Sequence, residues 1–350
     1  MLPYFAFWTL FAFAALGSSR RFSSLSQLVL ILLLTFFIGF RDRVGGDWFN
    51  YFPRVAAFIG APLTEVFRQN EFFYALLNWI GGNIGGSIYF VNTVCGLIFS
   101  SALVFFCRYQ PRPWLALSLA FPYLIMVVAM GYSRQGVAIG LEMVALLALQ
   151  NGRLFQFLIW IFFASSFHAP VLVLLILPIV IISGSGRSGQ FLRLLLLIGS
   201  AYGIYSAVIA PEIDYYLRSY IDAEYQSQGA WVRVVLSLIP ALVFLVNRRY
   251  FQLGINERRT WTLLSLMSVA SFILLLAGVS STAVDRMALY LIPLQLFVGS
   301  RIPDIRPLGA ESGTWNLILI LLSFFVLSIW LLFAANAYAW TPYRNLLFFY

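Results

Sequence analysis

The sequence contains no lysine, since all 22 of its basic residues are arginine. Schiff-base chemistry and the lysine of a phosphate-binding loop are therefore excluded. Histidine occurs once, as His168, and the two cysteines, Cys95 and Cys107, have neither the spacing of a redox motif nor that of a metal site. The sequence thus predicts no metal centre and no cofactor, and the cysteines are interpreted as packing residues.

Charged residues are also scarce, at 10% of the chain, whereas 61% of the residues are hydrophobic and the mean hydropathy is +0.89. This composition excludes a soluble globular domain and indicates an integral membrane protein. The net charge of +9 would suggest nucleic acid in a soluble protein, but these arginines lie between apolar runs and form no polybasic tail. The expected partner is therefore the lipid bilayer and not nucleic acid.

About twelve apolar runs divide the 350 residues. A spanning helix needs roughly 20 residues, and several runs are shorter, so one or two broken or tilted helices are expected. The first run lacks the preceding basic residues of a cleavable signal and is expected to remain as a helix. The sequence predicts an all-α polytopic membrane protein, with residues 1–350 forming one transmembrane domain. The runs are 2–16, 25–40, 88–106, 114–130, 136–149, 154–167, 169–182, 194–210, 234–246, 261–279, 287–299 and 315–335.

Arginine is unevenly distributed between alternate loops, which indicates the orientation of the chain. One set of loops has a large arginine excess and is predicted to be cytoplasmic. The other set balances its arginines with acids and is predicted to lie outside, together with both termini. The two longest segments between spans, 41–87 and 211–233, belong to this outer set. Within the first, residues 72–80 are expected to form a re-entrant or surface helix, and the second suits an amphipathic helix at the interface.

The first polar motif is RDRVGGDWFNY at residues 41–51, at the outer end of the second run. One interpretation is that Arg41 and Arg43 are interfacial anchors with aspartates as counter-ions. The paired glycines favour a different one, because they permit a sharp turn that brings Asp47 and Tyr51 near the arginines. The motif is therefore a candidate site.

The second motif is GYSRQG at residues 131–136, where Arg134 and Gln135 interrupt apolar sequence at the outer end of a run. A guanidinium offers a planar fork of donors that suits phosphate, so Arg134 is a candidate diphosphate ligand. A structural ion pair is the alternative. Glu142 is a plausible partner for Arg134, although two helical turns separate them. The alternative is that Glu142 forms a hydrogen bond with another helix.

The third and fourth motifs are FHAP at residues 167–170 and STAVDRMALY at residues 281–290. His168 is either a packed, hydrogen-bonded residue or a base, since histidine titrates near neutral pH. Asp285 and Arg286 are either a pair that caps a helix end or part of a site that includes Tyr290. All four motifs are predicted to lie on the outer side of the membrane, which is the main reason to consider them together.

Arginines, carboxylates, a histidine and aromatic side chains suit a ligand with phosphate and sugar parts. The arginines would hold a diphosphate and neutralise its charge as it departs, while aromatic rings stack on sugars. A carboxylate or the histidine would deprotonate an acceptor hydroxyl. The aromatic residues at these motifs are Trp48, Tyr51, Tyr132 and Tyr290.

The four motifs give the chain a resemblance to the EpsG family of bacterial membrane proteins, which are regarded as Wzy-like polysaccharide polymerases. The matching stretches are FRDRVGGDWFNY at 40–51, SRQGVAIG at 133–140, SSFHAP at 165–170 and DRMALY at 285–290. They occur in the family's order, and the apolar layout is similar over nearly the whole chain. Ala169 and Pro170 stand where the family often has a small polar residue after the histidine.

The resemblance implies a glycosyltransferase of the bacterial inner membrane with GT-C-like architecture, inverting and metal-independent. It would transfer a glycan chain from undecaprenyl diphosphate onto the next lipid-linked repeat unit at the periplasmic face. A chain-length-regulating co-polymerase is a further possible partner. Carried over residue by residue, Asp47 or His168 would be the base. The residues expected to bind substrate are Arg41, Arg43, Arg134 and Arg286, which contact diphosphate, with Gln135, Asp285, Tyr51 and Tyr290.

Two other activities fit the same sequence. A ligase would transfer a finished glycan to another acceptor, and its motifs would look the same. A transporter or flippase would move the lipid-linked glycan without chemistry, and it should carry charged residues near the membrane midplane and often internal repeats. Only Glu142 fits that description, so the sequence favours chemistry at the outer mouth.

Overall fold

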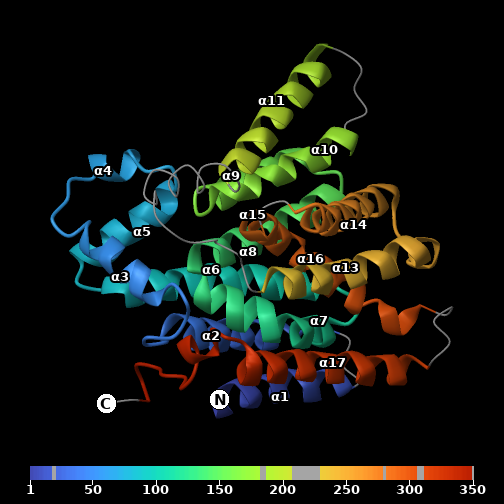
Figure 1. Cartoon of the computed structure of the whole chain (residues 1–350), viewed down its shortest axis with the longest axis horizontal. Helices are drawn as coiled ribbons and strands as arrows, with labels where there is room; N and C mark the ends of the chain where they lie inside the picture. The colour runs from blue at the N-terminus through green and yellow to red at the C-terminus, as the bar shows by residue number, and fades with distance from the viewer. Residues whose placement is uncertain (18–20, 182–186, 207–228, 279–280, 306–310, 349–350) are drawn as a thin grey trace. The chain divides into compact units, whose positions relative to one another are not determined.

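The computed structural model describes residues 1–17, 21–181, 187–206, 229–278, 281–305 and 311–348. Over these ranges the chain is helical and forms no strand, and a single isolated β-bridge joins Arg41 to Asn345 (Figure 1). The predicted all-α class is confirmed. Most of the predicted interfacial helix, residues 211–228 of the segment 211–233, lies outside the described residues.

The chain divides into two compact units, one made of Met1–Leu141 and Gly299–Tyr350, the other of Glu142–Val298. The division falls inside helix α8 (Ser133–Gln150). The first unit also contains α1 (Leu2–Leu16), α2 (Ser24–Gly39), α3 (Trp48–Ala56), α4 (Thr64–Phe67), α5 (Phe72–Asn83), α6 (Ser87–Arg108), α7 (Pro113–Ala120), the π-helical segment η1 (Phe121–Ala129), η6 (Ile302–Asp304), α17 (Ser312–Phe333) and η8 (Ala337–Ala339).

The second unit is helical throughout its described residues. Its elements after α8 are α9 (Leu154–Ser165), η2 (Ala169–Leu175), α10 (Ile176–Ile181), α11 (Arg187–Ile204), α13 (Ala230–Asn247), η4 (Arg248–Tyr250), α14 (Ile255–Leu276), α15 (Ser281–Ala288), η5 (Leu289–Leu291) and α16 (Ile292–Gly299). Within this unit α13 packs against α14 and α15, and α11 packs against η2.

Four of these helices, α6, α13, α14 and α17, are long and apolar enough to cross a membrane. Each coincides with a run that the sequence predicts to span. Six further apolar helices are shorter, among them α1, α2 and α9. The chain is therefore a helical membrane protein, while the number of about twelve spans, the single transmembrane domain and the GT-C-like architecture stay predictions.

Three predicted spans change helix type along their length. The run 114–130 forms α7 and η1, the run 169–182 forms η2 followed by α10, and the run 287–299 forms the end of α15, then η5 and α16. Pro170 lies in the first turn of η2, where a missing backbone N–H costs least. The expectation of one or two broken or tilted membrane helices stays a prediction.

The outer end of α2 is fixed by close packing against α6. A Cβ atom on Gly39 would lie 2.6 Å from the Cα atom of Thr93, and one on Gly96 would lie 3.4 Å from the carbonyl oxygen of Thr35. Small residues at a crossing let two membrane helices approach closely. This contact sets the position of the loop that begins directly after α2.

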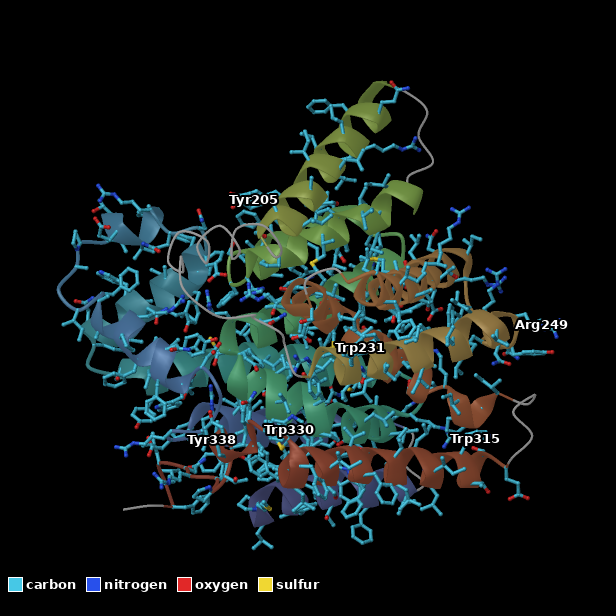
Figure 2. All side chains as sticks on the ribbon, viewed as in Figure 1. Tyr205, Trp231, Arg249, Trp315, Trp330 and Tyr338 are labelled. Atoms are coloured by element: carbon cyan, nitrogen blue, oxygen red, sulfur yellow. The ribbon has the colours of Figure 1, made fainter. Side chains whose placement is uncertain are left out.

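After α17 the chain folds back toward the start of the protein. Trp330, labelled on α17 in Figure 2, packs edge-on against Trp340 with ring centroids 4.8 Å apart. The hydroxyl of Tyr4 donates to the carbonyl of Trp340 at 2.7 Å, and α1 runs beside α17 (Figure 1). The hydroxyl of Tyr343 donates to the carbonyl of Phe37 at 2.9 Å. Residues 337–346, here called the C-terminal segment, thereby reach the end of α2.

Candidate active site

Arg41 is buried in the first unit, with only 1% of its surface exposed. Its Nε donates to the carbonyl of Val44 at 3.0 Å, and one terminal nitrogen donates to the carbonyl of Ile38. The other donates to Oδ1 of Asn92 at 3.1 Å and to Oγ of Ser133 at 2.8 Å. Burial lowers the pKa of Arg41 to about 10, so the guanidinium keeps its charge at neutral pH.

This network joins the first two motifs. Arg41 belongs to the first motif and Ser133 to the second, and Oγ of Ser133 also donates to Asn92 at 3.1 Å. Among the described residues no carboxylate forms an ion pair with Arg41, so a full positive charge is held by carbonyl, amide and hydroxyl oxygens. The predicted contact of Arg41 with diphosphate stays a prediction, and its observed contacts are internal.

The paired glycines shape the loop between α2 and α3 as the sequence suggests. Gly45 has a φ of +113°, and a Cβ atom there would collide with the carbonyl oxygen of Met130. The backbone N–H of Asp47 donates to the carbonyl of Gly131 at 3.3 Å. The loop therefore lies against the chain just before α8.

The C-terminal segment closes over the same loop. The backbone N–H groups of Asp42 and Gly45 donate to the carbonyls of Arg344 and Ala339, at 3.0 and 2.8 Å. The ring of Trp340 faces Gly46 and Gly131, and its indole N–H donates to the carbonyl of Met126 at 2.8 Å. The sequence gives no sign that these late residues support the first motif.

Arg134 lies in the first turn of α8 and forms an ion pair with Glu71, the residue before α5. Its Cζ lies 5.8 Å from the ring centroid of Tyr51 and 5.6 Å from that of Tyr74. Its Nε is buried without a hydrogen-bond partner. The structural ion pair considered for Arg134 is present, but the partner is Glu71.

Glu142 is fully buried, and neither of its carboxylate oxygens has a hydrogen-bond partner.

Tyr51 connects Arg134 to Asp47. The Tyr51 hydroxyl donates to Oδ2 of Asp47 at 3.2 Å, and Nδ2 of Asn50 donates to Oδ1 at 3.4 Å. Burial, together with the neighbouring Asp47 carboxylate, raises the pKa of Tyr51, so its hydroxyl stays protonated. Tyr51 thus lies beside Arg134 and joins it to Asp47, while the predicted approach of Asp47 to Arg41 and Arg43 stays a prediction.

The remaining residues of these two motifs differ in exposure. Arg43 is 64% exposed, has a φ of +51° and lies 4.0 Å from the carboxylate of Asp42, which is a weak exposed pair. Asp42 also accepts a hydrogen bond of 2.8 Å from the hydroxyl of Tyr89. Gln135 is buried. Arg43 is therefore the arginine of the first motif whose side chain is open to solvent.

In the second unit, the third and fourth motifs meet. Nδ1 of His168 and the hydroxyl of Tyr290 share a hydrogen bond of 2.5 Å. His168 precedes η2 with an extended backbone, and its N–H donates to the carbonyl of Ala164 at 3.0 Å. Tyr290 is fully buried in η5. The hydroxyl of Tyr290 thus orients the His168 ring, and the role of His168 as a base stays a prediction.

Asp285 forms its ion pair with Arg233 of α13, through two hydrogen bonds from the guanidinium. Asp285 is buried, so the pair links α13 to α15 inside the unit. Asp285 thus has a partner on another helix, and its predicted pairing with Arg286 stays a prediction. Arg286 is half-buried, and its predicted contact with diphosphate stays a prediction.

Sequence reasoning did not select several residues of these clusters. Glu71 and Arg233 are recognisable only as members of the outer set of charges, and Asn92 only as a polar residue inside an apolar run. Within the described ranges, no three His, Cys, Asp or Glu side chains gather so that they could hold a metal ion.

These features define a class: a helical membrane protein with buried and half-buried arginines, joined to polar partners, at the ends of its apolar helices. The EpsG family model matches residues 25–345, nearly the whole chain, and the chain belongs to the EpsG family. No curated protein and no solved structure matches it significantly. At the level of the family, this membership is consistent with a Wzy-like polysaccharide polymerase and with a role in polysaccharide biosynthesis at a membrane.

Proposed function

We propose that the protein is a polysaccharide polymerase of the bacterial inner membrane. Its donor would be a glycan chain on undecaprenyl diphosphate, and its acceptor a sugar hydroxyl of the next lipid-linked repeat unit, at the periplasmic face. The observation that carries the proposal is the environment of Arg134. Its guanidinium lies beside the rings of Tyr51 and Tyr74, and its buried Nε has no hydrogen-bond partner. Membership of the EpsG family supports the same activity.

In the proposed reaction, the acceptor oxygen attacks the anomeric carbon of the donor sugar and forms the new glycosidic bond. The bond from that carbon to the diphosphate breaks, and undecaprenyl diphosphate leaves with the electron pair. A single displacement of this kind inverts the anomeric configuration. Asp47 or His168 takes the acceptor proton, and this step is general base catalysis.

Arginines would neutralise the charge that develops on the departing diphosphate. Arg134 is the main residue for this role, because its Nε is available and its planar fork matches phosphate oxygens. Arg43 and Arg286 are further diphosphate contacts in the proposal, and Arg41 would act mainly by holding the loop. With the charge neutralised by guanidinium groups, the proposed reaction requires no metal ion. Gln135, Asp285, Tyr51 and Tyr290 complete the proposed substrate-binding set.

The test is an assay with purified protein and the lipid-linked repeat unit of its host, with products resolved by size. A ladder of products that persists with chelator is expected, and it should disappear in the Arg134→Gln variant at unchanged folding. Transfer of a finished glycan to a different acceptor, without a ladder, would indicate a ligase. Movement of the substrate across liposomes without any new glycosidic bond would indicate a transporter, and either result would overturn the proposal.

A further inference from the structure

Glu71 forms an ion pair with the guanidinium of Arg134. The two side chains are similarly shielded, with exposed fractions of 20% and 21%, so their ion pair lies between surface and interior. Glu71 precedes the first turn of α5, and its carboxylate makes no capping hydrogen bond there. A side chain that caps a helix at this position accepts a hydrogen bond from a backbone N–H in the first turn of that helix. Here the carboxylate pairs with Arg134 instead.

The surroundings of this pair leave two buried polar groups unused. Nε of Arg134 and the hydroxyl of Tyr74 are both buried without a hydrogen-bond partner. The rings of Tyr51 and Tyr74 lie 5.9 Å apart and both face the guanidinium. A buried donor without a partner is costly, and such groups often mark a place where another molecule supplies the acceptor.

A carboxylate and a phosphate offer an arginine similar paired oxygens. A diphosphate carries more charge and more oxygens than one carboxylate. It can therefore also accept a hydrogen bond from Nε of Arg134, which has no partner beside Glu71. Glu71 and the ligand would also repel each other if both stayed near Arg134.

We propose that Glu71 is the internal counter-anion of Arg134, and that a diphosphate group displaces it when the ligand binds. Glu71 then determines specificity by competition: a ligand must bind the guanidinium better than the carboxylate does, which favours diphosphates over weaker anions. This inference rests on the proposed function for the identity of the ligand. Binding of a diphosphate can nevertheless be measured without any polymerase reaction.

The experiment measures the affinity of the purified full-length protein for inorganic pyrophosphate and for farnesyl diphosphate, by titration at physiological ionic strength. Glu71→Gln removes the competing charge with little change of shape, and it should tighten binding of both probes about fivefold, the order expected from a partly exposed ion pair. Arg134→Gln should weaken binding at least tenfold. Tighter binding of farnesyl diphosphate than of pyrophosphate would identify a lipid-linked diphosphate as the source.

Glu65→Gln is the matched control, because Glu65 lies in the same segment and pairs with the exposed Arg68. It removes the same charge and should leave both affinities unchanged. If Glu71→Gln instead weakens binding, Glu71 orients Arg134 and the competition is wrong. If neither probe binds the wild-type protein while polymer still forms, the inference fails and the proposed function stands. If the affinities change as expected but no polymer forms, the proposed function fails alone.

Discussion

Arg41 brings a full positive charge into the interior of the first unit, where it is held by two backbone carbonyls, the amide oxygen of Asn92 and the hydroxyl of Ser133. A buried charge is costly unless its donors are satisfied. Four hydrogen bonds in several directions satisfy a planar guanidinium well. The same geometry suits a compact ammonium group poorly.

The first prediction concerns this geometry. Arg41→Lys should destabilise the protein by about 2–4 kcal/mol, because a lysine cannot reach all four partners and leaves buried acceptors unpaired. Thermal unfolding of the purified protein in detergent measures the effect as a lower Tm. Arg43→Lys is the control, since Arg43 is exposed, and its Tm should stay near that of the wild type. Equal Tm values for all three proteins would contradict the role assigned to Arg41.

The second prediction separates the two candidate bases. If His168 takes the acceptor proton, His168→Ala should lower the rate of polymer formation by about 10²–10⁴-fold, and Asp47→Asn should have a much smaller effect. Tyr290→Phe removes the hydroxyl that shares a hydrogen bond with His168, so it should also lower kcat, by a smaller factor, while folding is kept. A large loss for Asp47→Asn with little loss for His168→Ala would assign the base to Asp47.

Sequence reasoning found the residues that stand out chemically, and it missed their partners. Arg134 is visible because it interrupts an apolar run. Glu71 lies 63 positions away, and nothing in the local spacing connects the two, since helical periodicity relates only residues three or four apart. For the same reason the sequence does not connect Asp285 with Arg233, which is 52 positions away.

At the scale of elements, the C-terminal segment behaves as part of the loop between α2 and α3. Its carbonyls accept from the backbone N–H groups of Asp42 and Gly45, and the N–H of Leu346 donates to the carbonyl of Phe40 at 2.9 Å. Trp340 fills the space beside Gly46 and Gly131. The loop therefore depends on packing as well as on its own glycines.

The third prediction follows from this dependence. Trp340→Ala should speed hydrogen exchange at the backbone amides of the loop, because their acceptors on the C-terminal segment lose their anchor. Exchange measured by mass spectrometry on peptides that cover residues 40–50 would show the change. Tyr338→Ala is the matched control: Tyr338 lies in the same segment, is 77% exposed and is labelled in Figure 2. Unchanged exchange in the Trp340→Ala variant would contradict the prediction.

The apolar runs predicted the elements well where a run is long and uninterrupted. The four helices that are long enough to span a membrane were all expected from the sequence. The places where a run changes helix type were not predicted, since the division of 287–299 into η5 and α16 depends on packing. The π-helical segment η1 was not expected, because hydropathy cannot distinguish a π-helix from an α-helix.

At the scale of the whole molecule, the uneven distribution of arginine predicts which loops face which side of the membrane. Gln69 lies in the segment 41–87, which is predicted to be outside, and Arg258 lies near the start of α14, in a part of the chain that is predicted to be cytoplasmic. Both side chains are exposed. The native thiols, Cys95 and Cys107, are buried and unpaired, so they should not compete for a reagent.

The fourth prediction uses these positions. In intact cells, a maleimide that cannot cross the membrane should label a Gln69→Cys variant, and it should label an Arg258→Cys variant only after the membrane is permeabilised. The wild-type protein should remain unlabelled in both conditions. The opposite pattern of labelling would reverse the orientation, and it would place the first two motifs on the cytoplasmic side.

The contact between Tyr343 and Phe37 spans 306 residues of sequence. A ribosome adds about 5–20 residues per second. Roughly 15–60 s therefore pass between synthesis of the loop between α2 and α3 and synthesis of the C-terminal segment that packs against it. During that interval the early helices are already available for insertion, while the loop lacks its last hydrogen-bond acceptors. The protein thus completes its first motif only after residues 337–346 have been synthesised, when the helices between the two segments have already been made.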